Sequence, residues 1–453
     1  MKRLLPLVSL IALGACNLAP TYVRPSAPVP AAWPSGAAYP ARTDAPVGLP
    51  WTSLIGDTRL RTIIDRALAN NRDLRATLAN VLAARAQYRI QRAAQLPTVT
   101  AEAGASIARR NGDRQDSYSA DLGFSAFEID LFGRLRNLSE AALQSFLATK
   151  EGARSARIAL VAETADAYAT LAADQQLLAL SRDTLASAER TLSLTRTLNG
   201  VGLAGKLDVH QAETVVEQSR SDVAASVTQV AQDRNALDLL AGAPVEDALL
   251  PVSLDQLIAS TASVPAGLSS DVLLQRPDVL AAEHELIAAN ADIGAARAAL
   301  FPRISLTAAI GVASSALSSL FSSNGFSWSV APSAGLPIFG GGARANVAYS
   351  KAQRDAALAR YEGAIQTAFR EVADGLARAG TIGDQQRAQR ALVLSNQQAY
   401  ALSEQRYRAG IDPFLNALVA QRSLYGAQRS AIATDLELVR NRVLLYRVTG
   451  ADF

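Results

Sequence analysis

The chain has 453 residues, of which 49% are hydrophobic and 19% charged, and its formal net charge is +3. The positive residues are spread along the chain, so it lacks the concentrated basic field that nucleic-acid binding requires. The two histidines, His210 and His284, have no partners at metal-binding spacing and are interpreted as helix-surface residues. Because nucleotide-binding and nucleophile motifs are also missing, we expect no metal site, no catalytic centre and no enzyme activity.

The N-terminus has the pattern of an export signal. Two basic residues precede an apolar run over residues 4–13, which is too short to cross a bilayer as a helix but typical of a signal-peptide core. The run ends in Leu-Gly-Ala-Cys at residues 13–16, which resembles the bacterial lipobox, where the signal is removed before an acylated cysteine. We therefore predict that residues 1–15 are a lipoprotein signal peptide.

Cys16 is the only cysteine of the chain. A lone free thiol would be a liability in an oxidising compartment, so its position at the cleavage site favours lipidation over a structural role. The predicted modification is an S-diacylglycerol with an N-acyl chain, because stable anchoring takes at least two acyl signals. In bacterial lipoproteins an aspartate after the cysteine usually retains the protein in the inner membrane; Asn17 follows here, which implies the outer membrane. No other cofactor is expected.

The residues after the anchor form a Pro- and Ala-rich stretch that continues to Pro50. We interpret residues 16–58 as an extended, lipid-anchored segment that lies over a surface. Helical periodicity starts near Arg59.

Two halves of the chain repeat each other. Asn-Arg-Asp-Leu at 71–74 and Arg-Pro-Asp-Val at 276–279 each lead into an Ala-rich helix that stops at a proline, Pro97 or Pro302. Further matching segments follow in the same order in both halves, separated by nearly the same number of residues. We therefore predict one architecture built twice, with a first repeat over 59–250, a linker over 251–270 and a second repeat over 271–453.

Each repeat contains a predicted β-hairpin, over 97–129 and over 302–338. These stretches contain few charged residues, apolar and polar residues alternate along part of them, and each contains a polar turn. Four strands cannot close a lipid-facing barrel, but three copies would supply about twelve, within the range of known membrane barrels. The number of strands in each chain therefore predicts a homotrimer.

Two long helices, from about 137 to 199 and from about 344 to 408, would each be roughly 95 Å long at the usual rise per residue. Apolar residues step along them by three and four, as in coiled-coil seams. The second helix carries two such stripes, which indicates two neighbours, as in the wall of a closed tube.

The chain resembles the OprM/NodT lipoprotein branch of the TolC-like outer-membrane efflux proteins. The resemblance covers nearly the whole mature chain, and its most specific motifs are the lipobox, Pro-Thr-Tyr-Val-Arg-Pro at 20–25, Glu-Ile-Asp-Leu-Phe-Gly-Arg-Leu at 128–135 and Arg-Tyr-Arg-Ala-Gly at 406–410. It implies a mainly α fold with a membrane β part: a trimeric twelve-stranded β-barrel continued by a long α-helical barrel in the periplasm. The implied partners are a periplasmic adaptor protein and an inner-membrane pump of the resistance-nodulation-division type.

In this family the tunnel closes where the paired helices of each half turn back. The resemblance places those turns at Gly202 and Gly410, as docking sites for the adaptor, and glycine suits such turns because it takes positive φ at little cost. The positions that match the family's gate and constriction are Asp208, Tyr407, Leu415, Asn416, Val419 and Arg422. Relatives often carry Asp at position 419, and a ring of valines would form a dry constriction instead of a titrating one. We expect a contact of Asp208 with Arg422 or Tyr407 to lock the gate, that is, to hold it closed.

The predicted function is a passive exit duct of a tripartite efflux pump that carries small toxic compounds across the outer membrane. Two alternatives stay open: the duct of a protein-secretion or metal-export system, and a periplasmic scaffold lipoprotein without a channel. The duplicated hairpins argue against the scaffold, which has no use for strands at matching places in both halves.

Overall fold

The structure is a computed structural model, and it describes residues 17–40, 50–110, 113–263, 270–322, 325–339 and 341–450. Cys16 and residues 1–15 lie outside the described residues. Among the described residues, no helix combines the length and the apolar character needed to cross a membrane.

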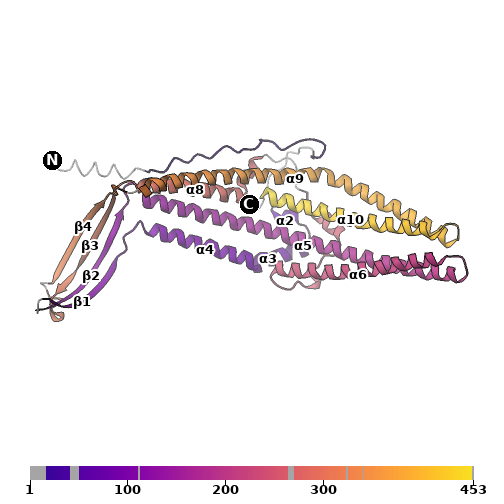
Figure 1. Cartoon of the computed structure of the whole chain (residues 1–453), viewed down its shortest axis with the longest axis horizontal. Helices are drawn as coiled ribbons and strands as arrows, with labels where there is room; N and C mark the ends of the chain where they lie inside the picture. Colours follow the sequence, from indigo (N-terminus) through magenta and orange to yellow (C-terminus); the bar gives the residue numbers. More distant parts are fainter. Residues whose placement is uncertain are drawn as a thin grey trace. The chain divides into compact units, whose positions relative to one another are not determined.

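The order helix, two strands, long helix, helix occurs twice along the chain (Figure 1). In the first half the elements are α3 (Thr58–Asn70), α4 (Arg72–Ala93), β1 (Thr100–Arg110), β2 (Asp113–Ile129), α5 (Arg134–Gly200) and α6 (Lys206–Ala241). In the second half they are α8 (Pro277–Ala298), β3 (Arg303–Ser314), β4 (Phe326–Gly335), α9 (Gly341–Arg408) and α10 (Phe414–Thr449). The short helices α2 (Trp51–Leu54) and α7 (Leu254–Ser260) precede and follow the first half. The predicted fold class, mainly helical with duplicated helix and hairpin units, is confirmed.

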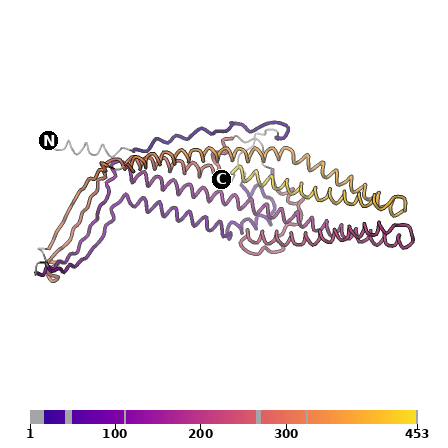
Figure 2. The backbone as a smooth tube through the Cα atoms, in the orientation of Figure 1, coloured from indigo at the N-terminus to yellow at the C-terminus, as the bar shows by residue number. Residues whose placement is uncertain are grey.

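The four strands form one antiparallel sheet in the order β1-β2-β3-β4 (Figure 2). Its two central strands come from different halves of the chain, so β2 pairs with β3 across about 180 residues of sequence; Leu122 faces Ile310, for example. A bulge interrupts this pairing between Phe124 and Phe127, where Ala126 has a positive φ of 51°. A bulge bends and twists a sheet locally.

The two faces of the sheet differ in polarity. Cross-strand partners lie on the same face, so Leu122, Ile310 and Trp328 form one apolar row, and Trp328 is 71% exposed. The opposite face is polar, and there the hydroxyls of Ser305 and Ser333 are hydrogen-bonded at 2.7 Å. An exposed apolar sheet face of this extent marks contact with another apolar surface.

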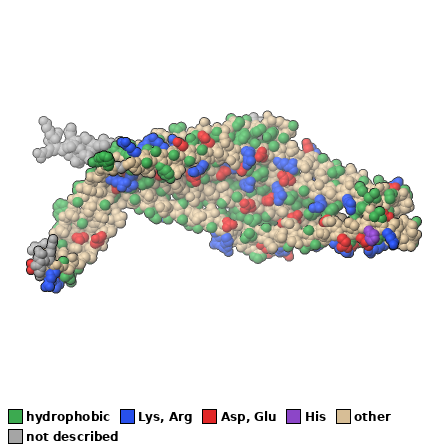
Figure 3. Space-filling view, viewed as in Figure 1, with side chains coloured by type: hydrophobic (Ala, Val, Ile, Leu, Met, Phe, Trp, Pro, Cys, Tyr) green, Lys and Arg blue, Asp and Glu red, His purple; other side chains and the backbone are tan. Residues whose placement is uncertain are grey.

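The chain divides into two compact units, and each draws segments from both halves of the sequence. One unit contains the sheet, most of α4 and α8, the start of α5 and of α9, and residues 17–27. The other contains α3, α6, α7, α10 and the remainder of α5 and α9. On the face shown in Figure 3, acidic and basic side chains are interspersed over the helices.

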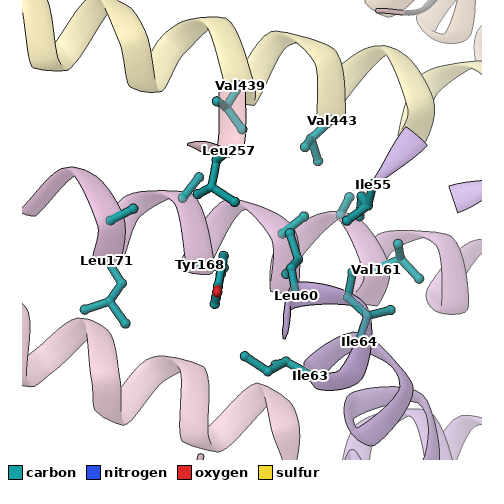
Figure 4. Packing of buried hydrophobic residues seen from close by; sticks show 14 of the residues in the cluster. Ile55, Leu60, Ile63, Ile64, Val161, Tyr168, Leu171, Leu257, Val439 and Val443 are labelled. Carbon is teal, nitrogen blue, oxygen red and sulfur yellow. The ribbon is translucent and has the colours of Figure 1, made fainter. Parts of the chain in front are cut away.

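The main hydrophobic core lies in the second of these units (Figure 4). Tyr168 of α5 is fully buried there, in one cluster with Ile63 of α3, Leu257 of α7 and Val439 of α10. Its hydroxyl donates to the carbonyl of Leu249 at 3.0 Å, so the ring buries apolar area without leaving a polar atom unpaired.

Corresponding residues of the two halves hold the ends of their last helices. Asn71 Nδ2 donates to the carbonyl of Leu240 at 3.2 Å, and Arg276 Nη1 donates to the carbonyl of Val448 at 2.6 Å. Both carbonyls are near a helix C-terminus, where backbone acceptors have no partner within the helix. The duplication therefore extends to how α6 and α10 end.

Candidate functional site at the helix-to-helix turns

The long helix α5 ends in a left-handed turn at Gly202, whose φ is 78°. The amide of Leu203 donates to the carbonyl of Leu198 at 2.8 Å, and the amide of Gly202 donates to that of Asn199 at 3.0 Å. This pair of bonds is a Schellman motif, which satisfies the last carbonyls of a helix and requires positive φ at its glycine position. The Asn199 side chain donates to the carbonyl of Ala204 at 2.7 Å and closes the turn.

The long helix α9 ends in the same motif, 208 residues further on. Gly410 has a φ of 71°, its amide donates to the carbonyl of Tyr407 at 3.0 Å, and the amide of Ile411 donates to that of Arg406 at 2.9 Å. A different side-chain contact closes this turn: the Arg406 guanidinium binds both carboxylate oxygens of Asp412, at 2.6 and 3.0 Å. The hydrogen bond from Arg406 lowers the pKa of Asp412.

Both glycines have open space where a Cβ would be, so only the backbone opposes a substitution. We expect Gly202→Ala or Gly410→Ala to lower the free energy of unfolding by about 1–2 kcal/mol, because an L-residue is strained in the left-handed region. Chemical denaturation of the purified protein measures this loss. Gly200→Ala, at a helical glycine that also has open space, is the matched control and is expected to be neutral or stabilising. Equal loss in Gly200→Ala and Gly202→Ala would contradict the assignment.

Tyr407 joins the two helical hairpins close to these turns. Its side chain is 5% exposed, its hydroxyl lies 2.9 Å from Thr195 Oγ1 of α5, and its ring centroid lies 5.3 Å from that of Phe414. Burial raises the pKa of Tyr407, and the charge of Asp208 acts in the same direction. Tyr407 therefore lies in a small core that contains residues of α5, α6, α9 and α10.

Asp208 lies in the first turn of α6, and its expected role in the gate stays a prediction. Its Oδ2 accepts a hydrogen bond from the amide of Gly205 at 2.9 Å, so it caps the first turn of α6. Among the described residues, no hydrogen bond or ion pair joins Asp208 to Tyr407 or to Arg422. Within one chain the hydroxyl of Tyr407 contacts Thr195.

The other four predicted gate residues share one exposed face of α10. Leu415, Asn416, Val419 and Arg422 are exposed, whereas the residues between them on the opposite face are buried. The buried residues are Phe414, Ala417, Leu418 and Gln421. This spacing of three and four is that of an amphipathic helix, although the exposed face is itself part apolar, since Leu415 is 53% and Val419 55% exposed.

The sequence matches the family described as "Outer membrane efflux protein" over residues 63–243 and 268–451. These two stretches cover most of the chain, and each contains one hairpin of the sheet and one helix-to-helix turn. The chain is an outer membrane efflux protein.

Similar proteins agree with this membership. "Solvent efflux pump outer membrane protein SrpC" of Pseudomonas putida is 44% identical over an alignment 461 positions long, which covers 99% of this chain and 98% of that protein. A solved membrane protein of Pseudomonas aeruginosa has a TM-score of 0.90 at 43% identity, covering 96% of this chain and all of that one. The open state of the Neisseria gonorrhoeae outer membrane channel MtrE has a TM-score of 0.87 at 35% identity, covering 96% and 98%.

These findings confirm the predicted function and location. This efflux protein is the outer-membrane channel of an efflux pump, and the family is one of channels, not one defined by a reaction. His210 is 74% exposed, with its Nδ1 3.0 Å from Glu213, as expected for a helix-surface residue. His284 is half-buried instead, and its Nδ1 lies 2.6 Å from Gln144 Oε1.

Sequence reasoning missed three residues at the turns of this efflux protein: Thr195, Phe414 and Asp412. Phe414 follows Pro413 at the first position of α10, and an apolar residue beside a helix-starting proline is a signal for an anchored helix start. Asp412 precedes that proline, six residues after Arg406. Thr195 had no comparable signal, since a threonine inside a long helix looks like many others.

Proposed function

We propose that three copies of this chain form the exit duct of a tripartite pump that expels small toxic organic compounds. The observation that supports this most directly is the sheet, which has one apolar face and two strands, β1 and β4, at its edges. Open edges do not survive in lipid, and pairing of β4 with β1 of the next copy would close twelve strands into one sheet. The name of SrpC, a solvent efflux pump protein, supports the proposed substrate class.

The helix-to-helix turns are the proposed docking sites for a periplasmic adaptor, which would join this duct to an inner-membrane pump of the resistance-nodulation-division type. Large apolar side chains are exposed around Gly202 and Gly410, and such a patch is costly unless another protein covers it. These side chains are Val201 at 66%, Leu203 at 77%, Leu207 at 68% and Ile411 at 62% exposed. The exposed face of α10 with Leu415, Asn416, Val419 and Arg422 is the proposed lining of the constriction.

Lipidation of Cys16 is also a proposal, and the segment that follows this residue supports it. The carbonyls of Leu18 and Pro20 accept hydrogen bonds from Arg297 and Asn290 of α8, at 3.0 and 2.7 Å. Because α8 leads directly into β3, these bonds place the residues after Cys16 beside the start of the sheet. Acyl chains on Cys16 would therefore enter the leaflet next to the sheet.

Deletion of the gene tests the proposed duct. We expect the deletion strain to become hypersensitive to many organic solvents, dyes and antibiotics, and wild-type protein to restore resistance. The measurement is a panel of minimal inhibitory concentrations, with Cys16→Ala as a second complementing variant that is expected to lose acyl labelling. Unchanged sensitivity to organic compounds, together with loss of one secreted protein or of metal tolerance, would replace drug efflux by secretion or metal export.

A further inference from the structure

The two helices of the first hairpin meet along a seam of small residues. Four positions of α5 recur every seven residues, and four positions of α6 do the same, as in a coiled coil. These positions are Asp174, Ser181, Ala188 and Thr195 on α5, and Asp233, Ser226, Ser219 and Ala212 on α6. The seam joins Ser181 Oγ to Ser226 Oγ at 3.5 Å, and seven residues nearer the base of the hairpin it brings together the two carboxyl groups of Asp174 and Asp233.

The carboxyl group of Asp233 is 9% exposed and has an unsatisfied oxygen. Its Oδ1 accepts from Gln229 Nε2 at 3.0 Å, whereas its Oδ2 has no donor within the described part of the chain. Asp174 is within hydrogen-bonding reach and can donate only when it carries a proton. An unpaired buried carboxylate oxygen is costly, so the geometry favours a proton between the two groups.

The surroundings of Asp174 also favour a proton on its carboxyl group. Burial, and then the hydrogen bond and the charge of Asp233, raise the pKa of Asp174 to about 7. The positive charge of Arg440 on α10 acts in the opposite direction, but its guanidinium also binds Asp166 at 2.7 Å and Thr170 at 3.0 Å. Asp174 and Arg429 of α10 both line a cavity of about 460 Å³, which gives solvent a path to the carboxyl group.

The second hairpin shows that the fold does not need carboxyl groups in this layer. Its turn glycine lies 208 residues after Gly202, and the positions 208 residues after Asp174 and Asp233 are Ile382 and Asn441. Ile382 is 2% exposed, and Asn441 Nδ2 donates to the carbonyl of Gly375 at 3.0 Å. In the second hairpin this layer therefore has no charged side chain, and its amide donates a hydrogen bond. In the first hairpin the same layer carries two carboxyl groups.

We propose that Asp174 and Asp233 form a proton-binding site that makes the first helical hairpin, and not the second, respond to pH. At lower pH one proton lies between the two carboxyl groups and holds α5 to α6 at the base of the hairpin. At higher pH the proton leaves to solvent, the negative charge of half-buried Asp174 faces that of buried Asp233, and the helices separate locally. The folded state raises this pKa above its ordinary value of 3.8. The contribution of the pair to the stability of the hairpin is therefore fully present below that value and is lost as the pH rises through about 7.

Infrared spectroscopy of the full-length channel tests for the shared proton. We expect a protonated-carboxyl band at pH 6 that disappears as the pH rises through about 7, and that is missing at pH 6 in Asp174→Asn. Asp222→Asn is the control, because Asp222 is a carboxylate of α6, the helix of Asp233, and accepts from Tyr425 at 3.0 Å; this variant should keep the band. A band that survives in Asp174→Asn, or that Mg²⁺ removes at pH 6, would overturn the proposal, the latter in favour of a cation site.

Hydrogen exchange then tests for the hairpin response. After correction for the intrinsic pH dependence, peptides of α5 and α6 around this layer should exchange about tenfold faster at pH 8 than at pH 6, the factor for one pKa unit of coupling. Peptides of α9 and α10 serve as the internal reference. The double variant Asp174→Ile/Asp233→Asn copies the layer of the second hairpin, so it should fold and lose the difference. Equal pH responses in both hairpins, or a response retained in the double variant, would contradict the proposal.

Discussion

Replacing Arg276 with methionine is expected to lower the free energy of unfolding by about 1.5–3 kcal/mol, because a buried guanidinium that binds two partly exposed carboxylates and a helix-end carbonyl is lost. The Arg276 side chain is 7% exposed and binds three groups: Asp278 at 2.7 Å, Glu371 at 2.9 Å and the carbonyl of Val448 at 2.6 Å. Methionine preserves most of the apolar stem but leaves two carboxylates and a helix-end carbonyl without their donor. Thermal and chemical denaturation of the purified channel measure the loss.

The control for this prediction is Arg387→Met. Arg387 also pairs with an acidic residue, Asp384, but both side chains are 76% exposed, so water replaces the contact and no measurable change is expected. Arg276→Lys adds a second comparison, since lysine keeps the charge but cannot bind three groups in a planar arrangement. A loss in Arg276→Met no larger than that in Arg387→Met would show that the network does not stabilise the fold.

The second large effect is expected for Phe414→Ala, which should destabilise the protein by about 3–5 kcal/mol through loss of a buried aromatic side chain. Phe414 is 2% exposed, its ring is tilted by 54° against that of Tyr407, and it packs in a small core with Ala188 and Leu192 of α5 and Val216 of α6. This core is what attaches the start of α10 to the first hairpin. Its loss should therefore loosen the turn at the end of α9 and make the channel leaky.

Two measurements check the effect of Phe414→Ala: hydrogen exchange in the first turns of α10, which should accelerate, and single-channel conductance in planar bilayers, which should rise. Leu415→Ala is the matched control, since Leu415 is the adjacent residue but is 53% exposed, so its truncation should leave the exchange in α10 unchanged. Protection in Phe414→Ala equal to that of wild type would refute the anchoring role.

Much of this protein could be predicted from the sequence, because the relevant signals are local. The two left-handed turns at Gly202 and Gly410 follow from a residue that takes positive φ freely, at the end of a long helical pattern. The two hairpins and the order of elements follow from hydrophobic periodicity and turn residues within stretches of 10 to 30 residues. The duplication is likewise readable from residue order alone.

Tertiary structure decided which side chains meet. Tyr407 reaches Thr195, Asp174 faces Asp233, and β2 pairs with β3, although long stretches of sequence separate the partners of each contact. Such pairings depend on the rotation and register of helices many turns long, where a shift of one residue turns a side chain by about 100° and replaces its partner. For that reason the sequence did not show that Asp208 caps the first turn of α6 or that a buried tyrosine and threonine join the two hairpins, while the gate contact of Asp208 stays a prediction.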